Sequence, residues 1–335
     1  MTAPLRAAIV GAGLMGRWHA HYAARAGAAV AAVVDRDPGA AAALQRRFPG
    51  ARAFAELGDC LARSGVDVVH VCTPAESHVP LAALALAAGK HTLVEKPAAA
   101  TAGEARELVA LAARHGVLLT PVHQFPFQRG VRHVRRHLNR LGEPVRVAFI
   151  ACTAGGEGLA GAERRRLLLD ILPHPFSLFR ALLGGEIERL DVGHFSLAED
   201  ELALRGALGG VRVEAFMSLR GRPIRNQLTV IGTGGTAHLD LYHGYGLIER
   251  GRVSRRAKLL QPFGYGGGLL LAAGTNGLRR ATRGEYAYPG LAELVRRFYD
   301  AAAYGGPAPI DDEETVGVAA LIDRLAGPGG RAAGR

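Results

Sequence analysis

The stretch Arg6–Gly16, RAAIVGAGLMG, joins a short apolar run to three glycines and then to a helix-forming segment. The apolar run predicts a buried strand. Glycines at this spacing permit a tight turn, close approach of a pyrophosphate and close packing of helix on strand. Backbone amides at the start of the helix would face the phosphate charge. The residues expected to hold a dinucleotide are Gly11, Ala12, Gly13, Leu14, Met15 and Gly16.

Asp35 ends the second predicted strand, 19 residues after Gly16. A carboxylate at this position can accept hydrogen bonds from an adenosine ribose, which favours a dinucleotide site over a plain glycine turn. Its negative charge would repel a 2′-phosphate, so the sequence favours NAD over NADP. The adjacent Arg36 could swing onto that phosphate, which keeps NADP open as an alternative.

Residues 1–122 alternate apolar runs with alanine-rich helical patterns, which predicts a doubly wound parallel sheet. Continuous apolar runs suit strands that are covered on both faces. The helix-start signals are Asp37-Pro38 and the capping box Thr101–Glu104. We therefore expect a Rossmann dinucleotide-binding domain. Its strands are expected at Arg6–Val10, Ala29–Val34, Asp67–Cys72, His91–Glu95 and Leu118–Val122.

Residues 123–335 show a different pattern, with strand-like segments that follow one another across glycine turns. Such hairpins predict an α+β domain with a large, mostly antiparallel open sheet. Helices are expected at Leu291–Ala303 and Glu313–Leu325. The glycine-rich stretch Phe263–Gly277 is expected to be either a mobile loop near a ligand or a disordered segment. The expected strands are Val145–Thr153, Ile187–Leu197, Leu202–Leu208, Val211–Leu219, Asn226–Gly232, Thr236–Leu241 and Gly246–Glu249.

The net charge of +11 raises a nucleic-acid hypothesis, and two basic clusters, Arg129–Arg140 and Gly251–Lys258, strengthen it. In the first cluster, Val131 and Val134 recur at helical spacing. Its arginines are therefore expected to form a solvated helix face or a surface that attracts an anionic metabolite. Since neither cluster contains a recognised nucleic-acid-binding motif, we expect no nucleic-acid partner.

Cysteine usage and hydropathy bear on the compartment. Cys60, Cys72 and Cys152 show neither metal-ligand spacing nor a disulfide framework, which fits a reducing environment. No apolar run reaches the ~18 residues that a membrane span needs, and the start of the chain lacks a secretory pattern. We expect a soluble cytoplasmic protein that binds no membrane and no metal.

The run Thr73–Pro97, TPAESHVPLAALALAAGKHTLVEKP, resembles the signature of the Gfo/Idh/MocA oxidoreductases, the family of glucose–fructose oxidoreductase and inositol dehydrogenase. GAGLMGRWH at Gly11–His19 and IGTGGTAHLDL at Ile231–Leu241 are also similar to motifs of that family, so the resemblance covers the whole chain. It implies that Lys96 lies beside the nicotinamide and the substrate, with Lys96-Pro97 a candidate cis peptide. Cofactor contacts are further implied for Cys72, Thr73, Pro74, His78, Glu95, Lys96 and Pro97.

The family's remaining catalytic pair comes from a DxGxH motif. LLLDILPHPFSLF matches it through Asp170 and His174, with Leu172 in place of the glycine. Because proline is comfortable only in the first turn of a helix, a helix is expected to begin near Leu172, with Asp170 just ahead of it. The resemblance implies catalysis by Lys96, Asp170 and His174. His174 would be the general acid and base, Lys96 would stabilise alkoxide charge, and Asp170 would orient the histidine or bind a neighbouring hydroxyl.

Departures from the family pattern occur where the family shapes its substrate pocket, at Thr73–Ala75, His123–Phe127 and Glu163–Leu167. The arginine triplet of the third segment either binds a carboxylate or diphosphate through paired hydrogen bonds or lies on a solvated loop. His19, His78 and His123 are interpreted as cofactor-loop or pocket residues rather than metal ligands. The expected substrate contacts are Lys96, His123, Gln124, Asp170 and His174.

The leading hypothesis is an NAD-dependent dehydrogenase or ketoreductase acting on a polyol-like compound: a sugar, sugar nucleotide, aminosugar or cyclitol. The excess of arginine favours an anionic one. A second hypothesis uses tightly bound NAD transiently for epimerisation or elimination. A third, a non-catalytic NAD-binding sensor, is disfavoured because a sensor needs no proton-transfer pair. The resemblance also implies a homo-oligomer, a dimer or tetramer, for which exposed faces of the antiparallel sheet are candidate contacts.

Overall fold

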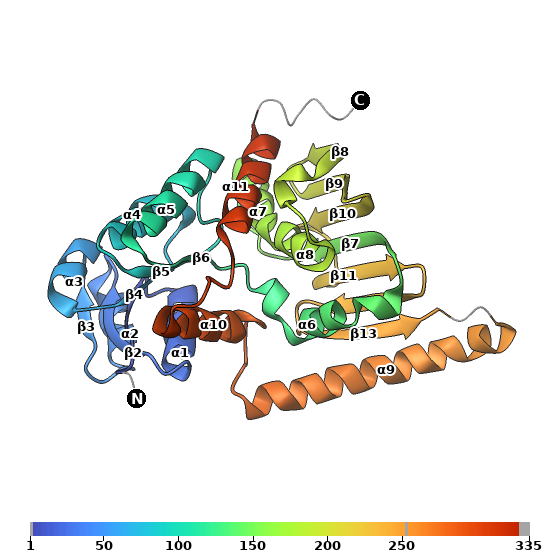
Figure 1. The fold of residues 1–335 in the computed structure, drawn as a ribbon, viewed down its shortest axis with the longest axis horizontal. Coiled ribbons are helices and arrows are strands. Elements are labelled where there is room, and N and C mark those ends of the chain that lie inside the picture. Colours follow the sequence, from blue (N-terminus) through green and yellow to red (C-terminus); the bar gives the residue numbers. More distant parts are fainter. Residues whose placement is uncertain (1–2, 252–253, 328–335) are drawn as a thin grey trace. The chain divides into compact units, whose positions relative to one another are not determined.

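A computed structural model describes residues 3–251 and 254–327, with side chains at all of these positions except 255–258. Its contacts divide the chain into two compact units (Figure 1). The first unit contains the residues up to His123 together with Leu291–Asp323, and the second contains Gln124–Gly290 together with the residues from Arg324 onward. The expected division at residue 122/123 differs from this by one residue and omits the return of the chain to the first unit.

Six parallel strands form the sheet of the first unit, in the order β3-β2-β1-β4-β5-β6. The order reverses beside β1, which confirms the doubly wound arrangement predicted from the sequence. β3 was not predicted, because three residues of which only the last is buried do not stand out as an apolar run. The strands are β1 (Arg6–Val10), β2 (Ala29–Val34), β3 (Arg52–Phe54), β4 (Val68–Val71), β5 (His91–Val94) and β6 (Leu119–Pro121).

Two of the helices between these strands start at the predicted signals. The Asp37 side chain accepts a hydrogen bond from the N–H of Gly39 at 2.8 Å, and Thr101 and Glu104 form a reciprocal capping box. Fully buried valines of β4 pack against the helices that cover the sheet. The loops at the ends of the strands therefore rest on a rigid support. The helices are α1 (Leu14–Arg25), α2 (Pro38–Gln45), α3 (Leu57–Ser64), α4 (His78–Ala87) and α5 (Ala102–His115), with a short 3-10 helix η1 (Ala75–Ser77) before α4.

Two helices from late in the sequence complete the first unit. α10 (Leu291–Tyr304) packs against α1 and buries Phe298 and Tyr299. α11 (Asp312–Ala326) begins in this unit, where Glu314 contacts His123. Apolar periodicity predicted both helices, but it carried no information on which unit they would join.

Seven strands form the sheet of the second unit, in the order β13-β12-β11-β7-β10-β9-β8. β7 and β10 run parallel and all other neighbours run antiparallel, which confirms the mostly antiparallel sheet. The strands are β7 (Pro144–Cys152), β8 (Asp191–Leu197), β9 (Glu201–Leu208), β10 (Val211–Ser218), β11 (Arg225–Gly232), β12 (Gly235–Asp240) and β13 (Tyr245–Arg250).

One predicted strand of this unit was too long. Ile187–Leu197 begins with a 3-10 helix, η4 (Ile187–Arg189), and only its second part is β8. Ile187 and Leu190 are both buried although they are three residues apart, which a helical turn allows and an extended strand does not.

Three helices cover one face of the second sheet (Figure 1): α6 (Arg129–Arg136), α7 (Gly161–Ile171) and α8 (Pro173–Leu183). In α6, Val131 and Val134 are fully buried, and Arg129, Arg135 and Arg136 are exposed, as the helical spacing predicted. The second basic cluster, Gly251–Lys258, lies largely outside the described side chains.

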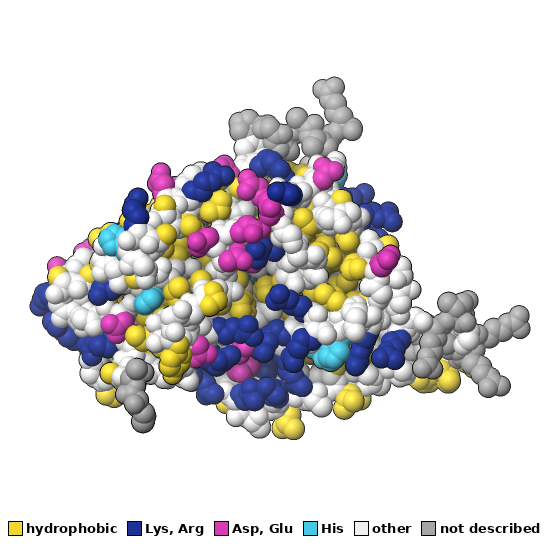
Figure 2. Space-filling model, in the orientation of Figure 1, with side chains coloured by type: hydrophobic (Ala, Val, Ile, Leu, Met, Phe, Trp, Pro, Cys, Tyr) yellow, Lys and Arg dark blue, Asp and Glu magenta, His cyan; other side chains and the backbone are white. Residues whose placement is uncertain are grey.

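The expectation of a loop or disorder at Phe263–Gly277 was wrong. This stretch lies within a long helix, α9 (Arg255–Thr282). Glycine disfavours a helix, which is why the sequence suggested a loop, but packing of one side of α9 on β13 overrides that preference. The other side leaves apolar residues exposed along the lower edge of the view in Figure 2. Within the described ranges, no helix has both the length and the apolar character needed to cross a bilayer.

Candidate functional site

The glycine loop between β1 and α1 is shaped by two steric requirements. Gly11 has a φ of +93°, and a Cβ there would lie 2.7 Å from the carbonyl oxygen of Cys72. A Cβ on Gly16 would lie 1.8 Å from the carbonyl oxygen of Gly11. Any larger residue at either position would therefore push the loop away from its neighbours. Around Gly13, by contrast, no surrounding atom lies within 4 Å of the Cβ position, so its backbone is open to a ligand.

Asp35 follows β2, and the backbone holds its carboxylate against the glycine loop. One oxygen accepts a hydrogen bond from the N–H of Ala12 at 2.7 Å, and the other accepts one from the N–H of Asp37 at 2.9 Å. The remaining lone pairs of a carboxylate fixed in this way are available to hydroxyl donors. Arg36 lies exposed beside it.

A pocket of about 580 Å³ opens beside the loop and Asp35. A carboxylate next to an apolar slot suits a ribose joined to a flat base. The lining residues that the sequence predicted are Gly11, Gly13, Asp35, Arg36, Cys72, Thr73 and Pro74. Apart from Val10 and Val34, which end β1 and β2, the lining residues that sequence reasoning missed are Ala55, Glu56, Leu57, Ser77, Pro80, Leu81 and Leu84.

The missed residues come from the segment after β3 and from η1 and α4. The first group follows a strand that the sequence did not reveal. The second group carried a usable signal, because Ser77, Leu81 and Leu84 recur at spacings of four and three residues and so share one side of a helix.

Other predicted cofactor residues do not line this pocket. Ala12 and Gly16 are buried within the turn, Met15 is half-buried, and Leu14 is 61% exposed. The last predicted residues, His78, Glu95, Lys96 and Pro97, belong to α4 and to a separate turn that follows β5.

Lys96 and Pro97 form this turn and are joined by a cis peptide bond, as the family resemblance implied. The ring nitrogens of His78 lie 2.7 Å from the carbonyl oxygen of Pro97 and 2.8 Å from that of Thr73. The N–H of Lys96 donates a hydrogen bond of 3.2 Å to a carboxylate oxygen of Glu95. These contacts tie the turn to the Thr73 loop and fix the backbone that carries the Lys96 ammonium.

Behind the turn, four buried side chains form one chain of hydrogen bonds. Tyr299 Oη lies 2.8 Å from His70 Nε2, and His70 Nδ1 lies 2.9 Å from His19 Nδ1. His19 Nε2 lies 3.1 Å from Glu95 Oε1. Because an ionised carboxylate only accepts, His19 donates to Glu95 through Nε2. The His19–His70 bond needs one donor and one acceptor nitrogen, and the Tyr299 hydroxyl can either donate to His70 or accept from it.

The surroundings of these groups shift their pKa values. Burial lowers the pKa of His70 well below its ordinary value, and the nearby His19 lowers it further. Burial raises the pKa of Glu95, but the hydrogen bond from His19, the charges of His19 and Lys96 and the hydrogen bond from the Lys96 backbone together outweigh it, so the net shift is downward. Burial and the Glu95 charge raise the pKa of Cys72 well above its ordinary value, so this thiol stays protonated and unreactive.

Asp170 lies just ahead of α8, as predicted, and it also lies in the last turn of α7, a helix that the sequence did not predict. Leu172 keeps right-handed helical backbone angles between α7 and α8, so the chain is helical on both sides of it. Pro173 occupies the start of α8, where its missing N–H costs nothing, which confirms the predicted helix start.

His174 follows in the first turn of α8 and is only 8% exposed. Its ring stacks on Phe125, with 4.1 Å between the ring centroids and 12° between the planes. The neighbouring Gln124 has a buried side-chain oxygen with no hydrogen-bond partner among the described residues. A buried acceptor of this kind is a candidate for a ligand contact.

The predicted substrate residues are divided between the two units. Lys96 and His123 belong to the first, whereas Gln124, Asp170 and His174 belong to the second. His123 is already engaged within its unit, since its Nδ1 lies 2.9 Å from a carboxylate oxygen of Glu314. Its first role is therefore to hold α11 at the end of β6.

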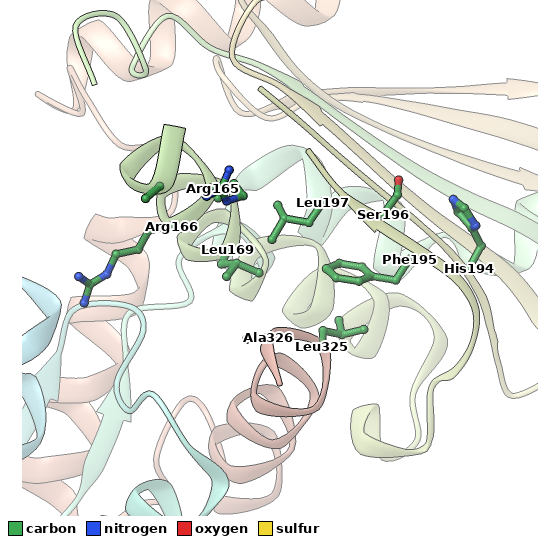
Figure 3. Close-up of a pocket in the computed structure, with 10 residues that line it drawn as sticks. Arg165, Arg166, Leu169, His194, Phe195, Ser196, Leu197, Leu325 and Ala326 are labelled. Carbon is green, nitrogen blue, oxygen red and sulfur yellow. The ribbon is translucent and has the colours of Figure 1, made fainter. Parts of the chain in front are cut away.

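The arginine triplet before Asp170 lies on α7 rather than on a loop. Two of its members, Arg165 and Arg166, line a second pocket of about 670 Å³ within the second unit (Figure 3). Leu169 and Phe195 give this pocket an apolar wall, from which Arg166 extends away. None of the predicted catalytic residues lines it.

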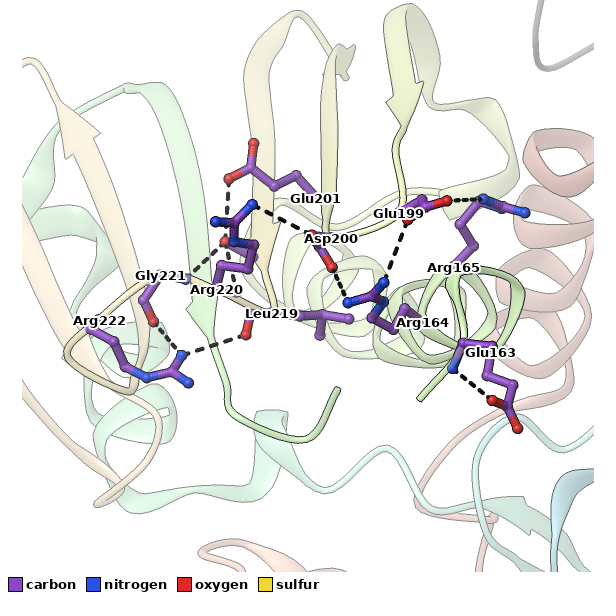
Figure 4. A network of polar contacts seen from close by, with 12 residues as sticks. Glu163, Arg164, Arg165, Glu199, Asp200, Glu201, Leu219, Arg220, Gly221 and Arg222 are labelled. Carbon is purple, nitrogen blue, oxygen red and sulfur yellow. Dashed lines mark hydrogen bonds and ion pairs between the residues drawn. The ribbon is translucent and has the colours of Figure 1, made fainter. Parts of the chain in front are cut away.

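Arg164, the first member of the triplet, is used by the fold. Its guanidinium lies 3.4 Å from a carboxylate oxygen of Glu199 and 3.2 Å from one of Asp200 (Figure 4). Arg165 lies 3.7 Å from the other oxygen of Glu199. These ion pairs join α7 to the turn between β8 and β9 and so restrain the helix that carries Asp170. In the part of the chain that the structure describes, no three His, Cys, Asp or Glu residues are grouped to hold a metal ion.

Comparison with known proteins yields a family and close relatives in sequence. The model of a family described as "Oxidoreductase family, NAD-binding Rossmann fold" matches residues 5–123. Inositol 2-dehydrogenase of Leifsonia xyli subsp. xyli is 32% identical over 235 residues, which cover 66% of this chain and 68% of that protein. Inositol 2-dehydrogenase 1 of Saccharopolyspora erythraea is 31% identical over 254 residues, which cover 71% and 74%.

Solved structures resemble this chain over nearly its whole length. GenD2 from gentamicin A biosynthesis, in complex with NAD, has a TM-score of 0.73 at 25% identity, covering 96% of this chain and 95% of that chain. The WlbA dehydrogenase from Bordetella pertussis, in complex with NADH and UDP-GlcNAcA, has a TM-score of 0.75 at 18% identity, covering 99% and 96%. At the lower identity the similarity concerns the fold alone.

We expect His70→Gln to weaken the pH dependence of stability. The folded-state pKa of His70 lies below its unfolded value of ~6.5, so the unfolded state binds the extra proton as the pH falls through this window. This residue should therefore lower the wild-type free energy of unfolding by up to ~1.4 kcal/mol per pH unit below about pH 6.5. The free energy of unfolding, measured by urea denaturation at several pH values between about pH 5 and 6.5, should change less steeply with pH in the variant than in the wild type.

His115→Gln is the matched control, because it removes an exposed histidine at the end of α5. It should keep the wild-type slope. Equal slopes for the wild type and His70→Gln would contradict a buried histidine that stays neutral.

Proposed function

The chain belongs to the Gfo/Idh/MocA family of oxidoreductases and is an NAD(P)-dependent dehydrogenase of CH–OH groups; from this premise we propose that it oxidises one carbinol of a polyol ring with Lys96, Asp170 and His174. The observation that carries the proposal is the anchored Lys96 turn. The N–H of Lys96 donates a hydrogen bond to the Glu95 carboxylate. The His78 ring contacts the carbonyl oxygens of Pro97 and Thr73, and Thr73 lines the pocket beside the glycine loop. A primary ammonium is thereby attached to the framework of the cofactor site.

The residues of the first unit fit NAD. A Cβ has no room at Gly11 or at Gly16, which keeps the turn tight, and the open backbone of Gly13 can admit a pyrophosphate. Asp35 offers fixed carboxylate oxygens to ribose hydroxyls. When bound, NAD supplies the acceptor for the hydride of the carbinol carbon.

The proton chemistry is assigned to three side chains. Loss of hydride requires the hydroxyl proton to leave, and His174 accepts it, because a neutral imidazole has an ordinary pKa of ~6.5. Lys96 donates a hydrogen bond to the same oxygen and stabilises its developing negative charge. Asp170, four residues before His174, orients the imidazole or binds a neighbouring hydroxyl.

The substrate class rests on two supports. Relatives at 31% and 32% identity are named inositol 2-dehydrogenases, which makes a cyclitol the first candidate. The buried oxygen of Gln124, next to the Phe125 ring that stacks on His174, can accept a hydrogen bond from a ring hydroxyl. Sugars, aminosugars and sugar nucleotides present the same vicinal hydroxyl pattern and belong to the same test.

The test follows nicotinamide absorbance while the protein and NAD meet a panel of cyclitols, sugars, aminosugars and sugar nucleotides. We expect turnover on at least one member. Lys96→Ala should lower kcat/KM on it by about 10²- to 10³-fold while NAD binding by calorimetry is unchanged. Full activity of Lys96→Ala would remove the lysine from the mechanism. If the wild-type protein binds NAD but shows no change in nicotinamide absorbance with any member of the panel, transient redox chemistry or a sensor would be favoured.

His174→Ala should lower kcat/KM by about 10²- to 10⁴-fold and also flatten its pH dependence. The reason is that His174 must be deprotonated before it can accept the hydroxyl proton, so its titration gives the rate its pH dependence. Phe125→Leu is the matched control, since it removes the stacking ring but keeps the imidazole, and it should retain the wild-type profile with a smaller loss. A profile for His174→Ala that keeps the wild-type shape would defeat the assignment.

Asp35→Ser should narrow the preference for NAD over NADP, because it removes the charge that would face a 2′-phosphate. We expect the ratio of the two dissociation constants, measured by calorimetry, to change by about tenfold or more. Asp37→Ser removes a carboxylate two residues away but keeps a helix-capping side chain, and it should change the ratio less. No change in Asp35→Ser would mean that the carboxylate does not select the cofactor.

A further inference from the structure

α9 carries an apolar stripe on the side that faces away from β13. Six large side chains on it are between 62% and 77% exposed: Leu259, Leu260, Phe263, Leu270, Leu271 and Leu278. At 3.6 residues per turn these positions fall on one side of the helix. Four glycines share that side, and no surrounding atom lies within 4 Å of their Cβ positions: Gly266, Gly267, Gly274 and Gly277.

The opposite side of α9 is anchored in the second unit. Asn276 donates a hydrogen bond of 2.9 Å to the carbonyl oxygen of His243, and Arg280 donates one of 3.0 Å to the same oxygen. A Cβ on Gly268 would lie 3.0 Å from the Leu247 side chain of β13. The direction of the stripe is therefore set by contacts within the unit, and the stripe faces solvent.

The composition of the stripe is unusual for the surface of a single copy. Exposed apolar patches of several hundred Å² are uncommon on soluble monomers. Glycine is the least favourable helix residue after proline, and among the described residues no atom outside the helix lies within 4 Å of the Cβ positions of these four glycines. The six exposed side chains offer on the order of 700 Å² per copy, close to the ~800 Å² per partner that a standard interface buries.

We propose that this stripe binds the same stripe of a second copy, with the two α9 helices antiparallel across a twofold axis. The axis passes the helix midpoint, between Gly268 and Leu269. In this register each stripe glycine receives a large side chain of the other copy. The pairs are Leu260 with Gly277, Phe263 with Gly274, Gly266 with Leu271, and Gly267 with Leu270, and the two remaining large residues, Leu259 and Leu278, lie opposite each other at the ends of the contact.

The large and small positions distinguish this arrangement from others. A parallel pair would set each residue against its own copy, so that Phe263 would meet Phe263 and Gly267 would meet Gly267. Large side chains would then clash while glycines enclosed voids. The antiparallel register matches knobs to holes, and a twofold interface must be self-complementary in this way. A lipid surface, the other common partner of an apolar helix side, requires no such pairing.

The first test measures the mass of the wild-type protein by light scattering and sedimentation over a range of concentrations. We expect the wild-type protein to be an assembly. Leu270→Glu should halve its mass and raise the dissociation constant at least ~100-fold, because the two introduced charges would be buried near the twofold axis. Gln261→Glu adds the same charge to an exposed position of α9 outside the stripe and should leave the mass unchanged.

Gly267→Leu separates association from folding. The Cβ position of Gly267 is open in the single copy, and leucine favours a helix, so this variant should fold at least as well as the wild type. In the pair, the new side chain would occupy the hole that receives Leu270. We expect Gly267→Leu to raise the melting temperature of the dissociated protein and to weaken association.

A cysteine pair tests the register. Phe263→Cys with Gly274→Cys in one chain should give a covalent dimer on mild oxidation, since the two positions are opposite each other across the axis but far apart along one helix. Phe263→Cys alone should not cross-link above the wild-type level, whereas a parallel pair would cross-link it.

Three outcomes would overturn the proposal. One is a wild-type protein that stays monomeric at all concentrations. Another is an unchanged mass in Leu270→Glu. The third is a monomeric wild type that binds vesicles containing anionic phosphatidylserine through α9, with binding lost in Leu270→Glu, which would assign the stripe to a membrane surface.

Discussion

The first unit depends on how closely α1 can start above β1. Gly16 passes over the carbonyl of Gly11 at a distance that leaves no room for a Cβ. One turn later His19 faces the sheet, where it reaches Glu95 under the Lys96 turn. The same close turn puts the N–H of Ala12 within reach of Asp35. One steric constraint thus positions both the acidic wall of the pocket and the buried polar chain behind the Lys96 turn.

Features with local causes were predictable from the sequence. The bounds of β1 and β2 were predicted to the residue, because continuous apolar runs between glycine turns suit strands covered on both faces. The cap at Asp37 and the capping box at Thr101 follow from side chains three residues or fewer from their partners. The roles proposed for Lys96 and His174 had no such local cause. Family resemblance named these residues, and no spacing in the chain would have done so.

Features that depend on distant contacts were not predictable. Tyr299 is 229 residues from His70, so no local pattern marks it as the end of the polar chain. The stacking of Phe125 on His174 likewise joins separate segments. In α9, local preference and final structure disagree, because packing on β13 outweighs the low helix propensity of glycine. Short strands such as β3 carry too few residues for a period to appear.

The late return of α10 to the first unit affects the order in which the protein can mature on the ribosome. The first 123 residues contain every strand of the Rossmann sheet, yet the helix that covers α1 ends only at Tyr304. At usual elongation rates, the time between synthesis of residue 123 and synthesis of Tyr304 is on the order of ten seconds or more. During that time the second unit is synthesised as an insertion, while the first waits with one side of α1 uncovered. The nascent chain is thus a natural client for chaperones that shield apolar surface.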